Sequence, residues 1–302
     1  MAAALPASPG KHIVDTLIEE RAPHLSGGPS WPLLRPVLYA MLNYRRARFL
    51  ADSIRPLGGV AAMDFISRML DLRVAADGLE AVPRTGPFLV LCNHPTGITD
   101  ALAVYDALKP LRPDLMFYAN SDAHRVCPDF SEVLIPVEWA QNKRTRARTR
   151  LTLQMTGEAI EAGRPIVIFP AGRLARQRPD GRLTDPEWMP TAVTLARRYE
   201  LPTIPLHVAG PYAFWFHLFD KFSRELRDMT LFHELLNKRG KTYRLTCGPQ
   251  ILPPALIGEP AIVARRIKYY IEQVLAHAPA QPFDPHGPEC DWRNPADAFQ
   301  QG

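Results

Sequence analysis

Short apolar segments alternate with amphipathic ones through the middle of the chain, from about residue 73 onward. The apolar segments are continuous, which is typical of strands buried on both faces of a sheet. They cover Phe88–Cys92, Met116–Ala119, Val133–Val137, Pro165–Phe169 and Thr203–Val208. Helical spacing separates several of them, at residues 100–108, 146–162 and 191–198. This alternation predicts an α/β fold with a mostly parallel or mixed central sheet that is flanked by helices.

An N-terminal helix pair is predicted before the sheet. Residues 32–56 predict one helix that begins near the prolines at 32 and 36 and ends at the proline at 56. Residues 61–72 predict a second helix. Arg45, Arg46 and Arg48 lie beside the apolar face of the first helix. The pair fits either a cover for the main domain or a surface that rests on lipid, with its arginines toward phosphates.

Changes in composition divide the chain into four regions. Residues 1–31 are rich in Pro, Gly and Ser around a short helical pattern at 13–21, which predicts a loosely attached arm. The helix pair occupies residues 32–72. Residues 73–278 form the predicted α/β domain, with an aromatic-rich helical insertion at 211–240 and a closing helix at 261–276. Residues 279–302 are rich in Pro and polar side chains and predict a disordered tail.

Composition and charge narrow the function only slightly. The chain has 302 residues, of which 46% are hydrophobic and 22% charged, as in ordinary globular proteins. Its net charge of +5 permits an anionic membrane surface, an acidic carrier protein or nucleic acid, but no nucleic-acid-binding module is recognisable. The four cysteines lack metal-binding or redox spacing, which indicates a reducing compartment. No secretory signal or membrane-spanning apolar run is visible, so a membrane role is predicted to be peripheral.

The first candidate for chemistry is a histidine at the end of a predicted buried strand. The segment Phe88–Cys92 leads into His94, and the proline that follows keeps His94 out of helical conformation. Gly97 allows a tight loop, through which Asp100 can fold back toward His94. A histidine oriented by a carboxylate can remove a proton from a hydroxyl group. The alternative is that Thr99 or Asp100 only caps the following helix.

A second strand end carries a turn and an arginine. The strand that ends at Phe169 leads through Pro170 and Gly172 into Arg173. Gly172 lets backbone N–H groups approach a ligand closely, and Arg173 can grip a phosphate with two parallel hydrogen bonds. Backbone N–H groups near Gly97 or Gly172 are candidates for holding an oxyanion. Both this strand and the one before His94 are expected to end at the same edge of the sheet.

A basic run follows the strand at 133–137. Lys143 and Arg144 are its members nearest the strand end. They fit an acceptor phosphate, an anionic lipid or an acidic acyl carrier, and they also fit a solvated face of the next helix. The later members, Arg146 and Arg150, are interpreted as that solvated face.

These segments together resemble the glycerolipid and lysophospholipid acyltransferase superfamily, which contains the 1-acylglycerol-3-phosphate acyltransferases. The segment from Asn93-His94 to Asp100 resembles its first motif, the segment from Phe169 to Arg173 its acceptor-binding motif, and residues 201–210 its fourth motif. Two differences, five residues between His94 and Asp100 and an alanine at 171 in place of a glutamate, are similar to the hemolysin-like branch. That branch is related to ornithine-lipid synthesis proteins.

The resemblance implies an O-acyltransferase in which His94 activates an acceptor hydroxyl and Asp100 orients His94. The implied substrate-binding residues are Gly97, Thr99, Phe169, Pro170, Gly172, Arg173, Lys143 and Arg144. The donor would be acyl-CoA or an acyl carrier protein, and the acceptor a lyso-lipid of the lysophosphatidic acid or lyso-ornithine-lipid class. No metal or other cofactor is implied. The resemblance also favours a membrane-resting helix pair, on a cytoplasmic protein peripheral to the inner face of an anionic membrane.

Two other functions fit the same residues. A lipid hydrolase would direct water to the same carbonyl group, although the chain has no Gly-x-Ser-x-Gly elbow. A non-catalytic lipid- or membrane-binding protein could retain the fold, since alanine replaces the glutamate of the acceptor-binding motif.

Overall fold

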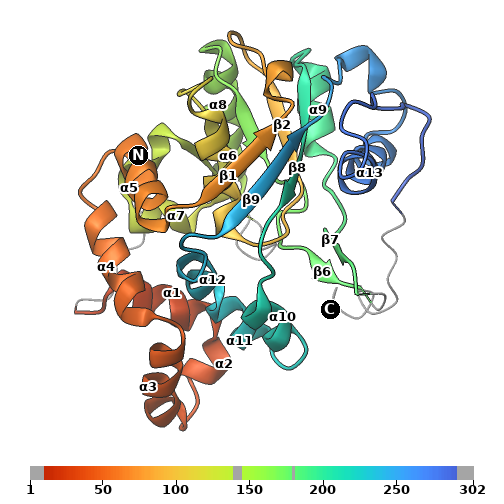
Figure 1. Ribbon diagram of the computed structural model, residues 1–302. Coiled ribbons are helices and arrows are strands. Elements are labelled where there is room, and N and C mark those ends of the chain that lie inside the picture. The colour runs from red at the N-terminus through yellow and green to blue at the C-terminus, as the bar shows by residue number, and fades with distance from the viewer. Residues whose placement is uncertain (1–9, 139–144, 179–180, 291–302) are drawn as a thin grey trace. The chain divides into compact units, whose positions relative to one another are not determined.

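The computed structural model describes residues 10–138, 145–178 and 181–290 (Figure 1). The chain divides into two compact units, each assembled from segments that are far apart in sequence. Unit 1 contains Met1–Ala75, Thr96–Glu158 and Gly210–Tyr243, and unit 2 contains Ala76–Pro95, Ala159–Ala209 and Arg244–Gly302. The predicted α/β region, residues 73–278, therefore contributes to both units.

Unit 2 is built on a mixed sheet whose central strand is β2 (Leu89–Cys92). β2 pairs in parallel with β5 (Ile166–Ile168) on one side and with β8 (Thr203–Ala209) on the other. β8 pairs in an antiparallel direction with β9 (Thr242–Cys247). Every residue of β2 is buried, as expected for a short apolar strand with neighbours on both sides. The predicted α/β fold class is confirmed.

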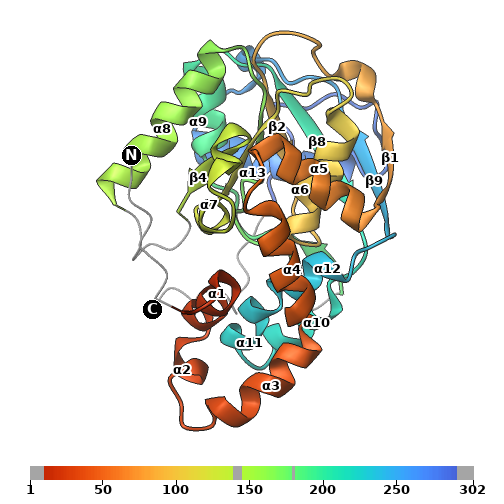
Figure 2. The same cartoon turned by 90° about the vertical axis from the view of Figure 1, so that its left-hand side faces the viewer.

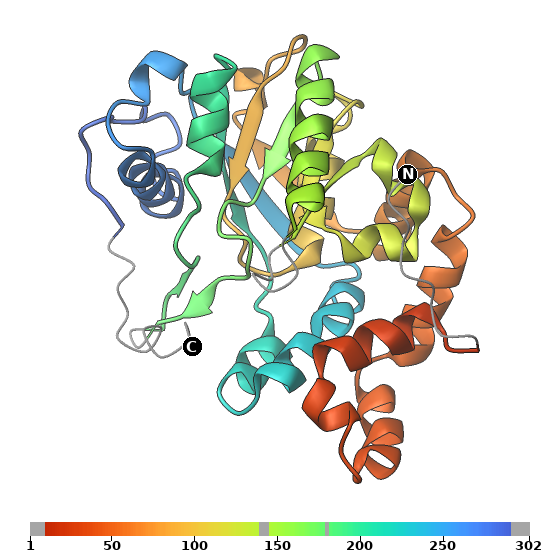
Figure 3. The ribbon, with the colours of Figure 1, turned by 180° about the vertical axis from the view of Figure 1, so that it is seen from behind.

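Helices cover the sheet of unit 2. α9 (Thr191–Arg198) packs against β2 through its buried apolar face. α13 (Pro260–Tyr269) lies beside α9, as Figure 3 shows from behind, and continues into a π-helical turn, Tyr270–Val274, that packs against β8. The predicted closing helix at 261–276 corresponds to α13 and this turn.

A small hairpin in unit 2 was not predicted. Its strands are β6 (Arg176–Gln177) and β7 (Leu183–Thr184), which pair in an antiparallel direction (Figure 1). Each strand has only two residues, too few to show an alternating pattern of apolar and polar positions. Figure 1 also shows β1 (Arg73–Asp77), which is likewise outside the predicted strands.

Unit 1 contains the parallel pair of β3 (Met116–Asn120) and β4 (Leu134–Val137). α6 (Ile98–Leu108) precedes β3, and α7 (Asp122–Val126) with a 3₁₀ turn, Pro128–Glu132, connects the two strands. α8 (Arg146–Glu161) follows β4. These elements agree with the segments predicted from periodicity, except for the short connecting helices.

The N-terminal helices of unit 1 differ from the prediction. The expected single helix over 32–56 is two helices, α3 (Trp31–Met41) and α4 (Tyr44–Ile54), and the second predicted helix is α5 (Gly59–Leu70). The break lies at Asn43, whose backbone is left-handed with φ of 56°. Asparagine tolerates this conformation better than most residues, which explains the interruption between two helical patterns.

The predicted N-terminal arm also carries packed structure. α1 (Ile13–Arg21) buries Val14, Leu17 and Ile18 within unit 1 and is followed by α2 (Pro23–Ser26). Residues 13–21 are therefore a packed helix rather than a loosely attached segment.

The aromatic-rich insertion of unit 1 is helical, as predicted. It comprises α10 (Phe214–Asp220), α11 (Arg224–Met229) and α12 (Leu231–Leu236). These helices lie beside α1, α2 and α4 in Figure 2. Glu225 of α11 accepts hydrogen bonds from the backbone N–H groups of His24 and Leu25, both at 2.9 Å. The insertion is thus tied to the N-terminal helices by polar contacts as well as by packing.

The described part of the C-terminal tail is held against unit 2. The hydroxyl of Tyr270 donates to the carbonyl oxygen of Gln281 at 2.6 Å, and Arg266 donates to that of Pro285 at 2.7 Å. The predicted disorder therefore does not apply to residues 281–290, and residues 291–302 lie outside the described part of the chain. No described helix is long and apolar enough to cross a membrane.

Replacing Leu89 by alanine tests the central position of β2. Leu89 has no exposed surface, so Leu89→Ala should lower the free energy of unfolding by about 2–5 kcal/mol, from lost burial and the cavity left behind. Urea denaturation measures this change. The matched control is Leu33→Ala, because Leu33 is 80% exposed and the same truncation should there have little effect. Equal losses in the two variants would contradict the assignment of β2 to the core.

Candidate active site

The main chain of His94 is held by hydrogen bonds on both of its polar groups. β2 ends two residues earlier, and the backbone N–H of His94 donates to both carboxylate oxygens of Asp185, at 3.0 and 3.1 Å. Its carbonyl oxygen accepts from the backbone N–H of Ala175 at 2.9 Å. Ala175 immediately precedes β6 and Asp185 immediately follows β7. The base of the β6–β7 hairpin therefore fixes the position of His94.

Asn93 fixes the same strand end from the opposite side. Its side-chain amide donates to the carbonyl oxygen of Val208 at 3.0 Å and accepts from the backbone N–H of Val208 at 2.7 Å. Through these two bonds the Asn93 side chain continues the pairing of β2 with β8 one residue beyond the end of β2. The backbone approaching His94 is thus restrained on both edges.

Asp185 is itself buried in a polar setting. It accepts a hydrogen bond from the indole N–H of Trp188 at 2.9 Å, and its own backbone N–H donates to Glu272 at 2.7 Å. Burial, followed by the negative charge of Glu272, raises the pKa of the Asp185 carboxyl from 3.8 to about 7. A raised pKa means that protonation favours the folded state. The contribution of this group to stability is therefore complete below pH 4 and is lost as the pH rises through about 7.

Lys268 completes this buried network. Its ammonium donates to Thr184 at 2.8 Å, to Glu272 at 3.0 Å and to the sulfur of Cys290 at 3.1 Å. Burial lowers the pKa of Lys268, but the negative charge of Glu272 and the contact with Cys290 outweigh burial and raise it overall. Lys268 therefore remains charged and balances the neighbouring carboxylates.

The pairing of β2 with β5 brings the predicted acceptor-binding segment to His94. The two strands are in register from Leu89 opposite Ile166 and end at the same edge, as predicted. The ring of Phe169 lies against the ring of His94, with centroids 4.5 Å apart and an angle of 33° between the planes. Pro170 is buried beyond it, and its carbonyl oxygen accepts from Met189 at 3.0 Å.

Arg173 lies at the open end of this segment. Gly172 turns the chain with φ of 61°, after which Arg173 is exposed. No hydrogen bond or ion pair joins its guanidinium to any other residue in the described ranges. Arg173 can therefore receive an anionic group of a ligand, the role predicted for it from the sequence.

Asp100 caps the helix that follows His94. Its carboxylate, buried at the third position of α6, accepts from the backbone N–H groups of Thr96 at 2.9 Å and Gly97 at 3.1 Å, and from the Thr96 hydroxyl. Gly97 is the N-cap residue, with φ of 114°, a conformation that side chains strongly disfavour. Thr99 is buried in the first turn of α6 rather than serving as the cap. The predicted capping role therefore belongs to Asp100.

The backbone N–H groups of Gly97 and Gly172 both bond within their own loops. The N–H of Gly97 donates to Asp100, and the N–H of Gly172 donates to the carbonyl oxygen of Phe169 at 2.9 Å. Each of these two N–H groups closes a local turn, and the expectation that N–H groups near Gly97 or Gly172 hold an oxyanion stays a prediction. Lys143 and Arg144, the predicted basic binding residues, lie outside the described residues.

Sequence reasoning missed Asp185 and its neighbours. Asp185 is 91 residues from His94 and its partner Glu272 is 87 residues further along the chain. The only local signal is the segment Asp185-Pro-Glu-Trp188, which places an acidic and an aromatic side chain close together after a short turn. A spacing of this kind does not reveal which backbone group the carboxylate holds.

The chain is similar to known acyltransferases. Residues 73–209 match the family model described as Acyltransferase. A lyso-glycine lipid O-acyltransferase of Phocaeicola vulgatus is 28% identical over 213 residues, covering 67% of this chain and 72% of the relative. Its counterpart from Bacteroides thetaiotaomicron is 23% identical over 209 residues, covering 67% and 74%.

One solved structure is also similar. The 1-acyl-sn-glycerophosphate (LPA) acyltransferase PlsC from Thermotoga maritima gives a TM-score of 0.46 at 14% identity, covering 90% of this chain and 97% of that one. The residues matched by the family model, 73–209, contain both His94 with Asp100 and the segment from Phe169 to Arg173. Residues 73–209 therefore carry an acyltransferase domain, and the protein is an acyltransferase.

Proposed function

We propose that this protein transfers a fatty acyl group from an acyl thioester to the hydroxyl group of a lyso-lipid, with His94 as the general base. The observation that carries this proposal is the position of His94. Its main chain is held at both polar groups, and its half-buried ring lies beside Phe169 at the carboxyl end of β2. Ligands of open α/β sheets bind at this end of the strands.

The reaction balances with His94 as the proton carrier. A ring nitrogen of His94 takes the proton of the acceptor hydroxyl while the oxygen attacks the thioester carbonyl carbon. The tetrahedral intermediate then collapses, the carbon–sulfur bond breaks, and the leaving thiolate takes the proton from the His94 imidazolium. The products are an ester and a free thiol, and His94 returns to its neutral form.

Asp100 is proposed to orient the ring of His94 and to stabilise its imidazolium form. Its carboxylate is fully buried and fixed by hydrogen bonds from Thr96 and Gly97, so its position is well defined. A fixed carboxylate costs no reorganisation when a positive charge forms beside it. This role adds to the helix-capping role of Asp100 and does not compete with it.

Asp185 is proposed as a positioning residue for the same step. It holds the N–H of His94 and is fixed in turn by Trp188. Displacement of a catalytic group by about 1 Å can reduce the rate about 10²-fold. Asp185 would therefore act through the main chain of His94 without touching the substrate.

The acceptor is proposed to be a lyso-lipid whose headgroup is an amino acid. Two relatives are named lyso-glycine lipid O-acyltransferases, and the glutamate expected in the acceptor-binding motif is replaced by the buried Ala171. Arg173 would pair with the headgroup carboxylate through two parallel hydrogen bonds. Lysophosphatidic acid is the second acceptor class, since the same guanidinium also fits a phosphate.

Unit 1 is proposed to rest on an anionic membrane through α3 and α4. Leu33, Val37 and Met41 lie four residues apart on one face of α3 and are 80%, 59% and 45% exposed. Exposed apolar side chains at helical spacing, followed by exposed arginines at the start of α4, suit a helix that lies in a lipid interface. The cytoplasmic face of the inner membrane supplies such anionic lipids.

Replacing His94 by alanine tests the catalytic base. His94→Ala should reduce acyl transfer by about 10² to 10⁴-fold without loss of folding, because general base catalysis is typically worth that much. Purified protein is incubated with labelled acyl-CoA or acyl carrier protein and with lyso-glycine lipid, lyso-ornithine lipid or lysophosphatidic acid. His207→Ala, at a half-buried histidine of β8, is the matched control.

The products separate the rival functions. Acylated lipid supports the proposal, free fatty acid released without acylated lipid identifies a hydrolase, and vesicle binding without donor consumption identifies a non-catalytic protein. Near-normal transfer by a folded His94→Ala variant would refute the role of His94.

Removing the Asp185 carboxylate tests its positioning role. Asp185→Ala should accelerate hydrogen exchange at the His94 amide and lower kcat by as much as about 10²-fold, with KM little changed. Exchange mass spectrometry of the peptide containing His94 measures the first effect and steady-state kinetics the second. Asp114→Ala is the control, because Asp114 pairs with the buried Arg112 at 2.8 and 2.9 Å in unit 1. Equal effects in both variants would indicate general destabilisation.

Charge reversal on α4 tests membrane attachment. Changing Arg45, Arg46 and Arg48 to glutamate should release the protein from anionic vesicles, because each basic residue near such a surface contributes about 1 kcal/mol. Co-sedimentation with phosphatidylglycerol vesicles measures the bound fraction. Reversal of three other exposed basic residues of unit 1, Arg146, Arg150 and Lys241, is the control. Equal retention of both variants would show that α4 is not the attachment surface.

A further inference from the structure

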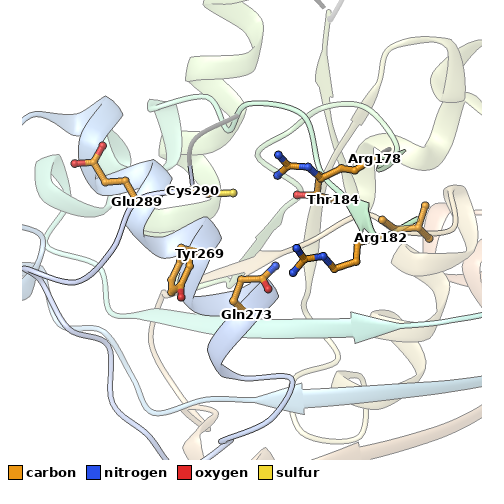
Figure 4. A pocket seen from close by; sticks show the side chains of 8 residues that line it. Arg178, Arg182, Thr184, Tyr269, Gln273, Glu289 and Cys290 are labelled. Atoms are coloured by element: carbon orange, nitrogen blue, oxygen red, sulfur yellow. The ribbon is translucent and has the colours of Figure 1, made fainter. Parts of the chain in front are cut away.

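A polar pocket of about 260 Å³ opens at the tip of the β6–β7 hairpin in unit 2. Arg178 and Arg182 line it from the hairpin, and Tyr269 and Gln273 line it from α13 and the π-helical turn (Figure 4). Figure 4 shows both guanidinium groups and the amide of Gln273 gathered around the same space. The pocket therefore presents several hydrogen-bond donors to one volume.

Three of these side chains are available to a ligand. Arg178, Tyr269 and Gln273 are half-buried, yet their side chains make no hydrogen bond with any other residue that the structure describes. Because these side chains are half-buried and face one cavity, their polar atoms can bond to a group that enters it. Donors dominate this set, and a guanidinium suits a phosphate particularly well.

Glu289, the carboxylate among the described lining residues, is paired with cations outside the pocket. The carboxylate of Glu289 pairs with Arg265 at 2.9 Å and Arg266 at 3.6 Å and points away from the two hairpin arginines in Figure 4. Cys290 accepts from the buried ammonium of Lys268 below the pocket. Among the described lining residues, no other carboxylate opposes the guanidinium of Arg178 at the pocket.

The hairpin sets the separation between this pocket and His94. Ala175 and Asp185, at its base, bind the main chain of His94. The pairing of β6 with β7 continues to the bond from the Arg178 N–H to the Arg182 carbonyl oxygen, at 2.8 Å. Each arginine is three residues along its strand from the base, which corresponds to about 10 Å of extended backbone.

We propose that this pocket binds the phosphate of a phosphopantetheine thioester donor, the arm that coenzyme A and acyl carrier proteins share. This inference rests on the proposed acyl transfer at His94. In a lyso-lipid acceptor the reactive hydroxyl lies only a few bonds from the anionic headgroup, which suits the nearer Arg173. In the phosphopantetheine arm a long chain separates the thioester sulfur from the phosphate, which suits a site at the end of the hairpin far from Ala175 and Asp185.

Direct binding tests the pocket without requiring turnover. The full-length protein is titrated calorimetrically with 4′-phosphopantetheine and with pantetheine, which differ only in the phosphate. The wild type should bind the phosphorylated probe at least about tenfold more tightly, since hydrogen bonds between charged partners contribute that much. Arg178→Ala and Gln273→Ala should reduce this preference. Arg244→Ala, at an exposed arginine of β9, should retain it.

Steady-state kinetics show whether the pocket binds the acyl donor or the acceptor. Arg178→Ala should raise KM for the acyl donor about tenfold or more and leave kcat and the acceptor KM unchanged. A higher KM for both acyl-CoA and acyl carrier protein indicates that the pocket binds the arm that the two donors share. A higher KM for acyl-CoA alone indicates that the pocket binds its nucleotide phosphates, which overturns the assignment. A higher KM for the acceptor alone would also overturn it.

The two proposals fail in different ways. If the wild type prefers the phosphorylated probe through Arg178 but transfers no acyl group, the phosphate-binding assignment is supported and the proposed reaction is refuted. If the wild type transfers acyl groups while Arg178→Ala changes neither the binding preference nor the donor KM, the reaction stands and the pocket assignment falls.

Discussion

The rest of the site depends on the hydrogen bonds from Asp185 and Ala175 that hold the main chain of His94, here called the His94 clamp. The last backbone groups of a strand lie beyond its paired residues and must find hydrogen-bond partners elsewhere. Here the N–H of His94 is held by a buried carboxylate and its carbonyl oxygen by the start of a hairpin, while Asn93 extends the pairing with β8. The ring of His94 consequently emerges from a backbone that is fixed on both sides. General base catalysis requires this kind of fixed geometry.

The clamp depends in turn on charges buried in unit 2. Asp185 and Lys268 are buried and both donate to Glu272, whose side chain is 6% exposed. Burying such groups is costly, and an apolar core of the same volume is often at least as stable. Groups of this kind with a perturbed pKa cluster at functional sites. The contact of Asp185 with His94 gives a physical reason for a charged network in this place.

The β6–β7 hairpin and the turn before it carry the arginines that are proposed to bind the substrates. Arg173 lies two residues before Ala175, whose N–H binds the carbonyl oxygen of His94, whereas Arg178 and Arg182 lie at the far end of the hairpin. An acceptor carries its reactive hydroxyl close to its anionic group, and a thioester donor carries its phosphate at the end of a long arm. Two arginine positions at different distances from one base can therefore separate the two substrates. The exposed apolar face of α3 adds a surface suited to the lipid that contains the acceptor.

Local patterns determined the fold class and the positions of most elements. Continuous apolar runs identified β2, β5 and β8, because strands buried on both faces need apolar side chains at every position. The resemblance of the segments around His94 and Arg173 to known motifs predicted the acyltransferase domain that the family model matches. The break at Asn43 was missed because both halves keep helical spacing, and the β6–β7 hairpin because its strands are too short to show a pattern.

Only the tertiary structure decided which groups serve the site. Asp185 and Glu272 come from segments distant in sequence. The local sequence around each carboxylate does not predict which backbone N–H group it will bind. The sequence also could not show that the N–H groups of Gly97 and Gly172 themselves close local turns. The sequence by itself determined the α/β pattern and the candidate base, because apolar periodicity and motif residues are local. Hydrogen bonds between distant segments form only in the folded chain, so the clamp and the pocket depended on tertiary structure.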